Sequence, residues 1–204
     1  MRRIELERIP QKSIRQFIKD QINDKVEKIH DLRSTYKKGD DLSAYLLHEE
    51  SYSFEYDTDK VWEHYMKANP AKVWKGAMLS FGLMLSKADE EIMYVDGDYG
   101  KAEVGQVIYI NLNILGGLIK VAVSHEIIEI NAEKKYFEIS YVKGSKSFGK
   151  QRIAFFPTGD GNTRVVHTTH YRSDSSFRDR YIYPFFHTKA ISEWHNNMIR
   201  SIED

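Results

Sequence analysis

The sequence predicts an α+β fold in which a curved antiparallel sheet surrounds a long C-terminal helix. In the second half of the chain, apolar and polar residues alternate with a period of two, which is typical of half-buried strands. Five segments show this pattern: 107–112, 118–130, 135–142, 147–156 and 163–171. Only short, turn-like sequences separate them, and connections so short join antiparallel neighbours. A helical pattern over about residues 176–202 then closes the chain.

The elements ahead of this run are a strand and two short helices. Residues 51–56 alternate well enough for a first strand. Asp57 or Thr58 can cap a short helix, and Asn69-Pro70 can begin another, because proline suits the first helical position behind an asparagine cap. Residues 78–100 show a mixed pattern and receive no assignment. Pro184 predicts a kink, or a short turn, near the start of the terminal helix.

The N-terminal segment predicts one more helix, from about residue 10 to residue 38. Apolar residues recur there at spacings of three and four and form one stripe. These residues are Ile14, Phe17, Ile18, Ile22, Val26, Ile29, Leu32 and Tyr36. Gly39 offers a C-terminal cap. We therefore expect a helical extension over residues 1–50 and a main domain over residues 51–204.

Composition narrows the class of protein. The 204 residues carry 30 basic and 30 acidic side chains, a balance that argues against a nucleic-acid partner. The chain contains no cysteine, which excludes disulfides, thiolate metal sites and cysteine nucleophiles. The charged N-terminus is unlike a signal peptide, and the longest uncharged stretch, residues 104–119, contains polar residues and two glycines. We expect a soluble, cytoplasmic protein without an integral membrane segment.

No cofactor or metal is predicted. The run Gly144 to Lys150 has the spacing of a phosphate-binding loop, but Gln151 stands where Ser or Thr would bind magnesium, and no helix follows. The eight histidines include no His-Glu-x-x-His arrangement. A hairpin turn and dispersed histidines are the better interpretations.

The order of elements resembles the START-like or Bet v 1-like superfamily, also called SRPBCC or polyketide cyclase-like. The resemblance covers about residues 51–204 and rests on a strand, two short helices, a run of antiparallel strands and a long terminal helix. It implies a helix-grip domain with an apolar, ligand-sized cavity between sheet and terminal helix. The superfamily has no universal catalytic signature, so the resemblance assigns no catalytic residue. The N-terminal helix is an addition to its minimal pattern.

Alternation along the strands and the helical stripe predict which side chains face this cavity. The set is mostly apolar, with polar side chains scattered through it, as in many small-molecule sites. The predicted ligand-binding residues are His125, Phe137, Ile139, Tyr141, Ile153, Phe155, His167, Thr169, Tyr171, Tyr181, Phe185 and His195. The alternative for each polar member is a side chain satisfied by its neighbours in the core.

Three functions follow from these observations. The first is binding of a hydrophobic small molecule, lipid-like or aromatic, without catalysis. The second is an enzyme of the cyclase or hydrolase kind that uses histidines and tyrosines of the cavity as acid and base, which requires groups such as His125 and His167 to converge on one point. The third is a structural or interaction protein, for instance a homodimer, that uses the apolar stripe of the N-terminal helix.

Overall fold

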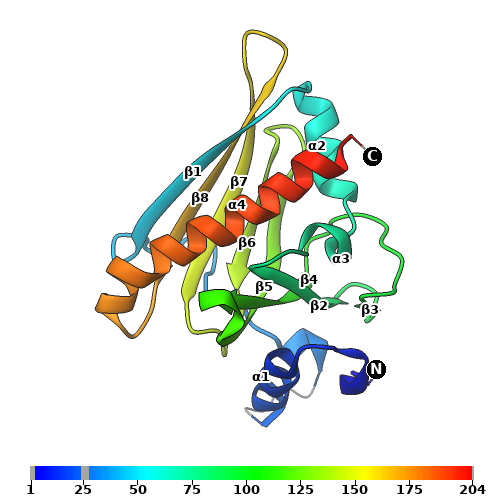
Figure 1. Ribbon diagram of the computed structural model, residues 1–204, viewed down its shortest axis with the longest axis vertical. Helices are drawn as coiled ribbons and strands as arrows, with labels where there is room; N and C mark the ends of the chain where they lie inside the picture. Colours follow the sequence, from blue (N-terminus) through cyan, green and yellow to red (C-terminus); the bar gives the residue numbers. More distant parts are fainter. Residues whose placement is uncertain (1–2, 24–27, 204) are drawn as a thin grey trace.

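The computed structural model describes residues 3–23 and 28–203, which form one eight-stranded antiparallel sheet curved around the terminal helix (Figure 1). The spatial order of the strands is β1-β8-β7-β6-β5-β4-β2-β3. The strands are β1 (Leu46–Phe54), β2 (Leu79–Ser86), β3 (Ile92–Tyr94), β4 (Gln106–Ile114), β5 (Ile119–Asn131), β6 (Tyr136–Tyr141), β7 (Phe148–Pro157) and β8 (Thr163–Arg172). The predicted α+β class, with a helix gripped by an antiparallel sheet, is confirmed.

The strands in which apolar and polar residues alternate were predicted from the sequence. The observed strands differ from the predicted ones at β1, β2 and β3. β1 begins at Leu46, ahead of the predicted residue 51, and pairs along its whole length with β8. β2 and β3 come from the stretch that received no assignment. Seven of the eight residues of β2 are buried, because both faces of this strand are covered. A strand of that kind loses its period of two.

The helices on the concave face begin where their capping residues predict. Asp57 accepts a hydrogen bond from the backbone nitrogen of Lys60 (2.9 Å) ahead of α2 (Thr58–Lys67), and Asn69 accepts one from Ala71 (2.9 Å) ahead of α3 (Pro70–Val73). The terminal helix α4 (Tyr183–Ser201) crosses the concave face of the sheet. A π-helical turn, Arg178–Ile182, precedes it. The chain is helical from residue 176 to residue 201, and Pro184 follows the π-helical turn directly. The irregular turn thus lies where proline, which has no N–H, cannot donate an α-helical hydrogen bond.

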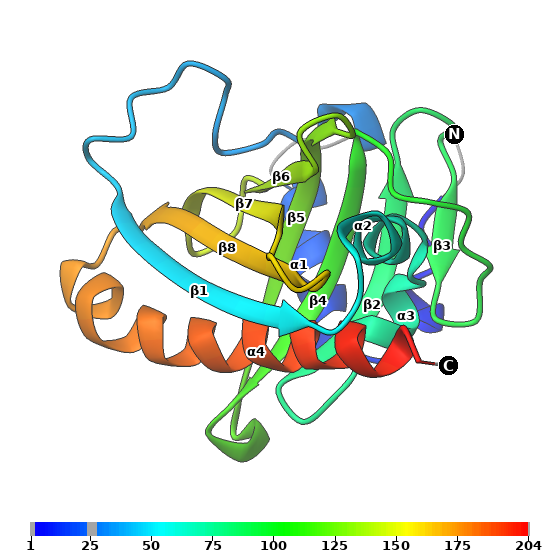
Figure 2. The same cartoon turned by 90° about the horizontal axis from the view of Figure 1, so that it is seen from above.

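The helix α1 (Lys12–Asn23) lies on the convex face, on the opposite side of the sheet from α4 (Figure 2). The prediction that this helix continues to residue 38 is wrong; its residues 24–27, Val26 included, lie outside the described part. Ile29–Asp31 form a 3-10 turn, and residues 32–45 are irregular, with turns and one isolated bridge at Ser34. Thr35 N–H donates to the carbonyl oxygen of Tyr141 (2.7 Å), so this segment bonds to the end of β6 instead of to itself.

The apolar stripe of α1 is buried within the protein. Ile14 and Ile18 are 0% and 2% exposed and pack with Leu83, Val107 and Tyr109 of the sheet. The approach is close, because a Cβ placed on Gly82 would lie 2.5 Å from the Cδ1 of Ile14. The sheet is thus covered on both faces, by α4 on the concave side and by the N-terminal segment on the convex side.

Truncation of this stripe is expected to destabilise the whole protein. Ile14→Ala should lower the free energy of unfolding by about 3 kcal/mol, since it leaves a cavity in a closed core. Ile22→Ala, on the same helix but 50% exposed, is the matched control and should change it by less than about 0.5 kcal/mol. Urea unfolding followed by tryptophan fluorescence measures both. Equal effects of the two substitutions would contradict the packing described.

Candidate ligand-binding site

A cavity of about 300 Å³ lies between the concave face of the sheet and α4. This volume is at the lower end of the range for small-molecule sites, roughly 300–1,000 Å³. Most of the wall is apolar. The apolar side chains are Trp74, Leu79, Ile110, Leu112, Ile114, Val121, Val123, Ile182, Phe186, Ala190 and Ile191. The polar ones are His125, Tyr141, Lys146, Ser147, Gln151, Arg178, Tyr183 and His187.

A second, much smaller cavity of about 40 Å³ adjoins the first. The two share Trp74, Ile110 and His125 as lining residues. Phe137 and Ile139 line only the smaller cavity.

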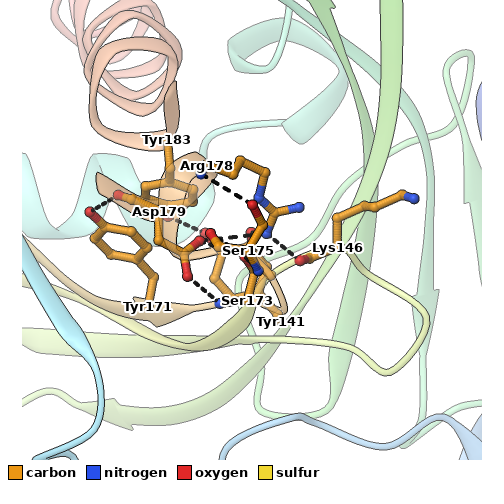
Figure 3. A network of polar contacts seen from close by, with 9 residues as sticks. Tyr141, Lys146, Tyr171, Ser173, Ser175, Arg178, Asp179 and Tyr183 are labelled. Atoms are coloured by element: carbon orange, nitrogen blue, oxygen red, sulfur yellow. Dashed lines mark hydrogen bonds and ion pairs between the residues drawn. The ribbon is translucent and has the colours of Figure 1, made fainter. Parts of the chain in front are cut away.

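The β8–α4 connection positions one end of the main cavity (Figure 3). Asp179, 5% exposed, accepts hydrogen bonds from the backbone N–H and the hydroxyl of Ser173, both at 2.6 Å. Tyr171 donates its hydroxyl to the backbone oxygen of Asp179 (2.9 Å). These bonds hold the π-helical turn against the end of β8. The position of this π-helical turn places Arg178 and Tyr183 on the cavity wall.

A buried glutamine on β7 joins three polar side chains. The Gln151 amide nitrogen lies 3.0 Å from Nε2 of His125 and 3.1 Å from the hydroxyl of Tyr141. Its amide oxygen lies 2.7 Å from Nε2 of His167. An amide nitrogen only donates and an amide oxygen only accepts. Therefore Nε2 of His125 accepts, and Nε2 of His167 carries a proton.

The same reasoning continues into the core beyond His167. A neutral His167 protonated at Nε2 accepts at Nδ1, and the atom it faces is Nε2 of His195, 2.9 Å away. His195 therefore carries its proton on Nε2 and accepts at Nδ1 from the hydroxyl of Tyr65 (2.6 Å). The result is a chain of hydrogen bonds with one direction, from Tyr65 through two histidines to Gln151 and on to the cavity wall.

Burial keeps this network uncharged. Loss of solvation lowers the pKa of His125 to about 4 and that of His195 to about 3. Burial, and then the nearby His195, hold the pKa of His167 well below its ordinary value. Burial also raises the pKa of Tyr141 to about 12 and that of Tyr183 well above its ordinary value. At neutral pH all of these groups are in their neutral forms.

Three donors at the cavity are left without an acceptor among the described residues. The hydroxyls of Tyr141 and Tyr183 bond to each other, and whichever one donates, the O–H of the other stays unpaired, because Gln151 offers Tyr141 only an N–H. His125 accepts at Nε2, so its Nδ1 carries an N–H. The Nε of Arg178 is buried without a partner.

One buried acceptor stands beside these donors. Thr188 donates its hydroxyl to Glu50 (3.0 Å), so its oxygen accepts from Nε2 of His48 (2.8 Å). Nδ1 of the neutral His48 then accepts from Nδ1 of His187, 3.2 Å away. Nε2 of His187 is left as an acceptor, buried and without a partner among the described residues.

The structure brings some of the predicted site residues to a cavity and places others in the core. His125 and Tyr141 line the main cavity, and Phe137 and Ile139 line the smaller one. Another six are buried but line neither cavity: Ile153, Phe155, His167, Thr169, Tyr171 and His195. Whether any of them binds a ligand stays a prediction.

Two predicted residues of the terminal helix are corrected. Tyr181 and Phe185 are 63% and 54% exposed and line neither cavity. A π-helical turn bonds residues five apart and so holds more residues per turn than an α-helix. This change of phase lies ahead of Tyr183, so it accounts for Tyr181. Phe185 lies in the regular part of α4, where the cavity face follows Tyr183, Phe186, His187 and Ala190 and leaves Phe185 to one side. Tyr183, Phe186 and His187 face the cavity instead.

The sequence analysis missed these three residues and Arg178. The available signal for Arg178 was Pro184, because proline indicates a break in the α-helical period just before it. Tyr183, Phe186, His187 and Ala190 recur at helical spacing and form a stripe of their own. The apolar residues of β2 and β4 that complete the wall had no comparable signal.

Several solved structures share this architecture. A norcoclaurine synthase from Thalictrum flavum matches with a TM-score of 0.56 at 12% identity, over 82% of this chain and 94% of that one. KanY protein matches with a TM-score of 0.57 at 11% identity, over 79% and 99%. A protein from Chromobacterium violaceum matches with a TM-score of 0.52 at 11% identity, over 78% and 98%. The chain has the Bet v 1-like fold.

At these identities the likeness concerns the fold alone. No family model and no curated protein matches the sequence. In the part of the chain that the structure describes, no helix is long and apolar enough to cross a bilayer. Within residues 3–23 and 28–203, no group of three or more histidine, aspartate or glutamate side chains is arranged to hold a metal ion.

Proposed function

We propose that this protein binds a hydrophobic small molecule, aromatic or lipid-like, in the cavity between the sheet and α4. The observation that carries the proposal is a cavity of about 300 Å³ whose wall is mainly apolar and also holds polar side chains. Protein interiors are close-packed, and spaces much larger than a water molecule are few. A space of this size between the sheet and α4, lined mainly by apolar side chains, therefore favours an occupant.

A structure of the same fold supports the kind of ligand. The norcoclaurine synthase from Thalictrum flavum is described in complex with dopamine and hydroxybenzaldehyde, which are both aromatic. A protein of this fold can thus bind an aromatic molecule with polar substituents.

The geometry gives less support to acid–base catalysis by His125 and His167. Both rings converge on Gln151, but they meet at its amide and not at an open point of the cavity. Both nitrogens of His167 bond to protein groups, and His167 does not line the cavity. The interaction role loses its main support too, because Ile14 and Ile18 of the N-terminal stripe are covered by the protein's own sheet. A homodimer and a cytoplasmic location stay predictions.

Filling the cavity is expected to abolish binding. The probe is N-phenyl-1-naphthylamine, a neutral aromatic dye whose fluorescence rises in apolar surroundings. Ala190, on the cavity side of α4, is 7% exposed. Ala190→Trp should weaken dye binding about tenfold or more, since the indole takes the space of the ligand. Lys189→Trp, at the exposed position just before Ala190, is the matched control and should bind the dye as the wild type does.

Thermal unfolding checks that both variants fold, and Val121→Phe provides a second way to fill the cavity if Ala190→Trp does not fold. Native mass spectrometry of the purified protein gives an independent readout. Unchanged dye affinity in folded cavity-filling variants would overturn the proposed function.

A further inference from the structure

The cavity's polar end presents more hydrogen-bond donors than the protein can satisfy. One hydroxyl of the Tyr141–Tyr183 pair, the Nδ1–H of His125 and the Nε–H of Arg178 have no acceptor among the described residues. The Nε of Arg178 is buried, and a buried donor without a partner costs about 1–3 kcal/mol. Three unpaired donors stand against one unpaired acceptor, Nε2 of His187, and this excess of donors indicates that an acceptor comes from outside the chain.

These groups are neighbours. The rings of His125 and Tyr141 are 4.7 Å apart between centroids, and the hydroxyls of Tyr141 and Tyr183 are hydrogen-bonded. Burial dominates the pKa of both tyrosines, and the positive charge of Arg178 is near enough to act in the opposite direction on each. Figure 3 shows Arg178 beside this pair.

The charge at this end is positive. Arg178 and Lys146 line the cavity, and no aspartate or glutamate does so among the residues that the structure describes. Asp179 lies 3.8 Å from Arg178, but its carboxylate is bound by Ser173. Arg178 and Lys146 against Asp179 leave one net positive charge. The neutral histidines add nothing to it at neutral pH.

The part of the wall formed by β2, β4 and the start of β5 is apolar. Leu79 pairs with Leu112 and Leu112 with Val121 in the sheet, and all three line the cavity. An apolar body would be desolvated there while a head group reaches the donors.

We propose that the ligand is an amphipathic organic anion whose carboxylate or other acidic oxygen group binds Arg178, His125 and the Tyr141–Tyr183 pair. This inference rests on the proposed function and names the ligand class. An anionic acceptor fits the site better than a neutral hydroxyl, because hydrogen bonds to a charged acceptor are shorter and about twice as strong.

A matched pair of ligands tests the head group. 1-Naphthaleneacetate and 2-(1-naphthyl)ethanol share ring and chain length and differ in the charged group. Each competes with N-phenyl-1-naphthylamine for the wild-type protein at pH 7.5. We expect the carboxylate to compete about tenfold or more better than the alcohol, and the preference to shrink at high salt.

Arg178→Gln should reduce this preference to about threefold or less, with little effect on the alcohol. Arg180→Gln removes the same charge from an exposed position of the same turn that does not line the cavity, and should leave the preference unchanged. Arg178 also bonds to the backbone of Lys146 and to Ser147, so Arg178→Gln can disturb the local structure. Lys146→Gln, at an exposed position, is therefore the second test and should reduce the preference for the carboxylate by a smaller factor.

Equal competition by acid and alcohol, unaffected by Arg178→Gln, would overturn this inference and leave the proposed function standing. Absence of dye binding to the wild type would overturn both. The two failures are therefore distinguishable.

Discussion

Between pH 7.5 and pH 5.0 the free energy of unfolding is expected to fall by about 6 kcal/mol, because three buried histidines must stay neutral in the folded protein. His125, His167 and His195 are 7%, 0% and 0% exposed. A histidine that is neutral when folded and titrates near pH 6.5 when unfolded loses about 2 kcal/mol over this interval. A typical domain is stable by roughly 5–15 kcal/mol, so this loss is a large part of the total.

The direction follows from the pKa values. Burial lowers the pKa of His125 to about 4 and that of His195 to about 3, and holds that of His167 well below its ordinary value. A lowered pKa means that the unfolded chain binds protons more readily than the folded one. The stabilising contribution is complete above about pH 6.5 and is lost as the pH falls towards the folded values.

Urea unfolding at several pH values measures this fall. Calorimetry in buffers of different ionisation enthalpy gives the number of protons taken up on unfolding. We expect about three or more at pH 5.5 and close to none at pH 8, which is the internal control. A stability that stays flat between pH 7.5 and pH 5.0 would show that these histidines are protonated in the folded state.

Gln151→Leu is expected to lower the free energy of unfolding by roughly 3–9 kcal/mol. The substitution replaces the amide side chain with an apolar one of similar size. It therefore removes the hydrogen-bond partner of His125, Tyr141 and His167 at once. Each of these buried polar groups then lacks a hydrogen bond, at about 1–3 kcal/mol apiece.

Thr169 supplies the matched control on the neighbouring strand. It pairs directly with Gln151 in the β7–β8 ladder, is 0% exposed, and its hydroxyl has no partner among the described residues. Thr169→Val should therefore be neutral or stabilising, since it removes a buried polar atom that bonds to nothing described. Denaturant unfolding at pH 7.5 compares the two variants. If Gln151→Leu were as mild as Thr169→Val, the hydrogen-bonded chain would not stabilise the fold.

Much of the sheet could be predicted because alternation records which side of a strand is buried. In β8, Val165, His167, Thr169 and Tyr171 were predicted to face inward, and all four are buried, while Arg164 is exposed. The same logic failed for β2, where both faces are covered and nearly every residue is buried. Helical periodicity failed after Ile29, where apolar residues with helical spacing lie on an irregular backbone that bonds to the end of β6.

The site was less predictable than the sheet. His125 and Tyr141 lie on regular strands, and alternation placed them correctly on the concave side. Tyr181 was misplaced because it lies in a π-helical turn, which changes the phase of the helix. Phe185 was misplaced because the cavity face of α4 follows Tyr183, Phe186 and His187 instead. That turn is held by Ser173 and Tyr171 contacting Asp179, which are contacts between β8, its loop and the helix. A periodicity within one segment carries no information about them.

The sequence by itself determined the α+β class, the order of elements and the buried side of β5 to β8, because period, turn residues and caps act over short stretches of chain. Only the tertiary structure decided that α1 covers the convex face, that Gln151 joins two histidines and a tyrosine, and that Arg178 and Tyr183 reach the cavity. These features depend on side chains far apart in sequence, whose distances and hydrogen-bond directions exist only once the sheet has closed around α4.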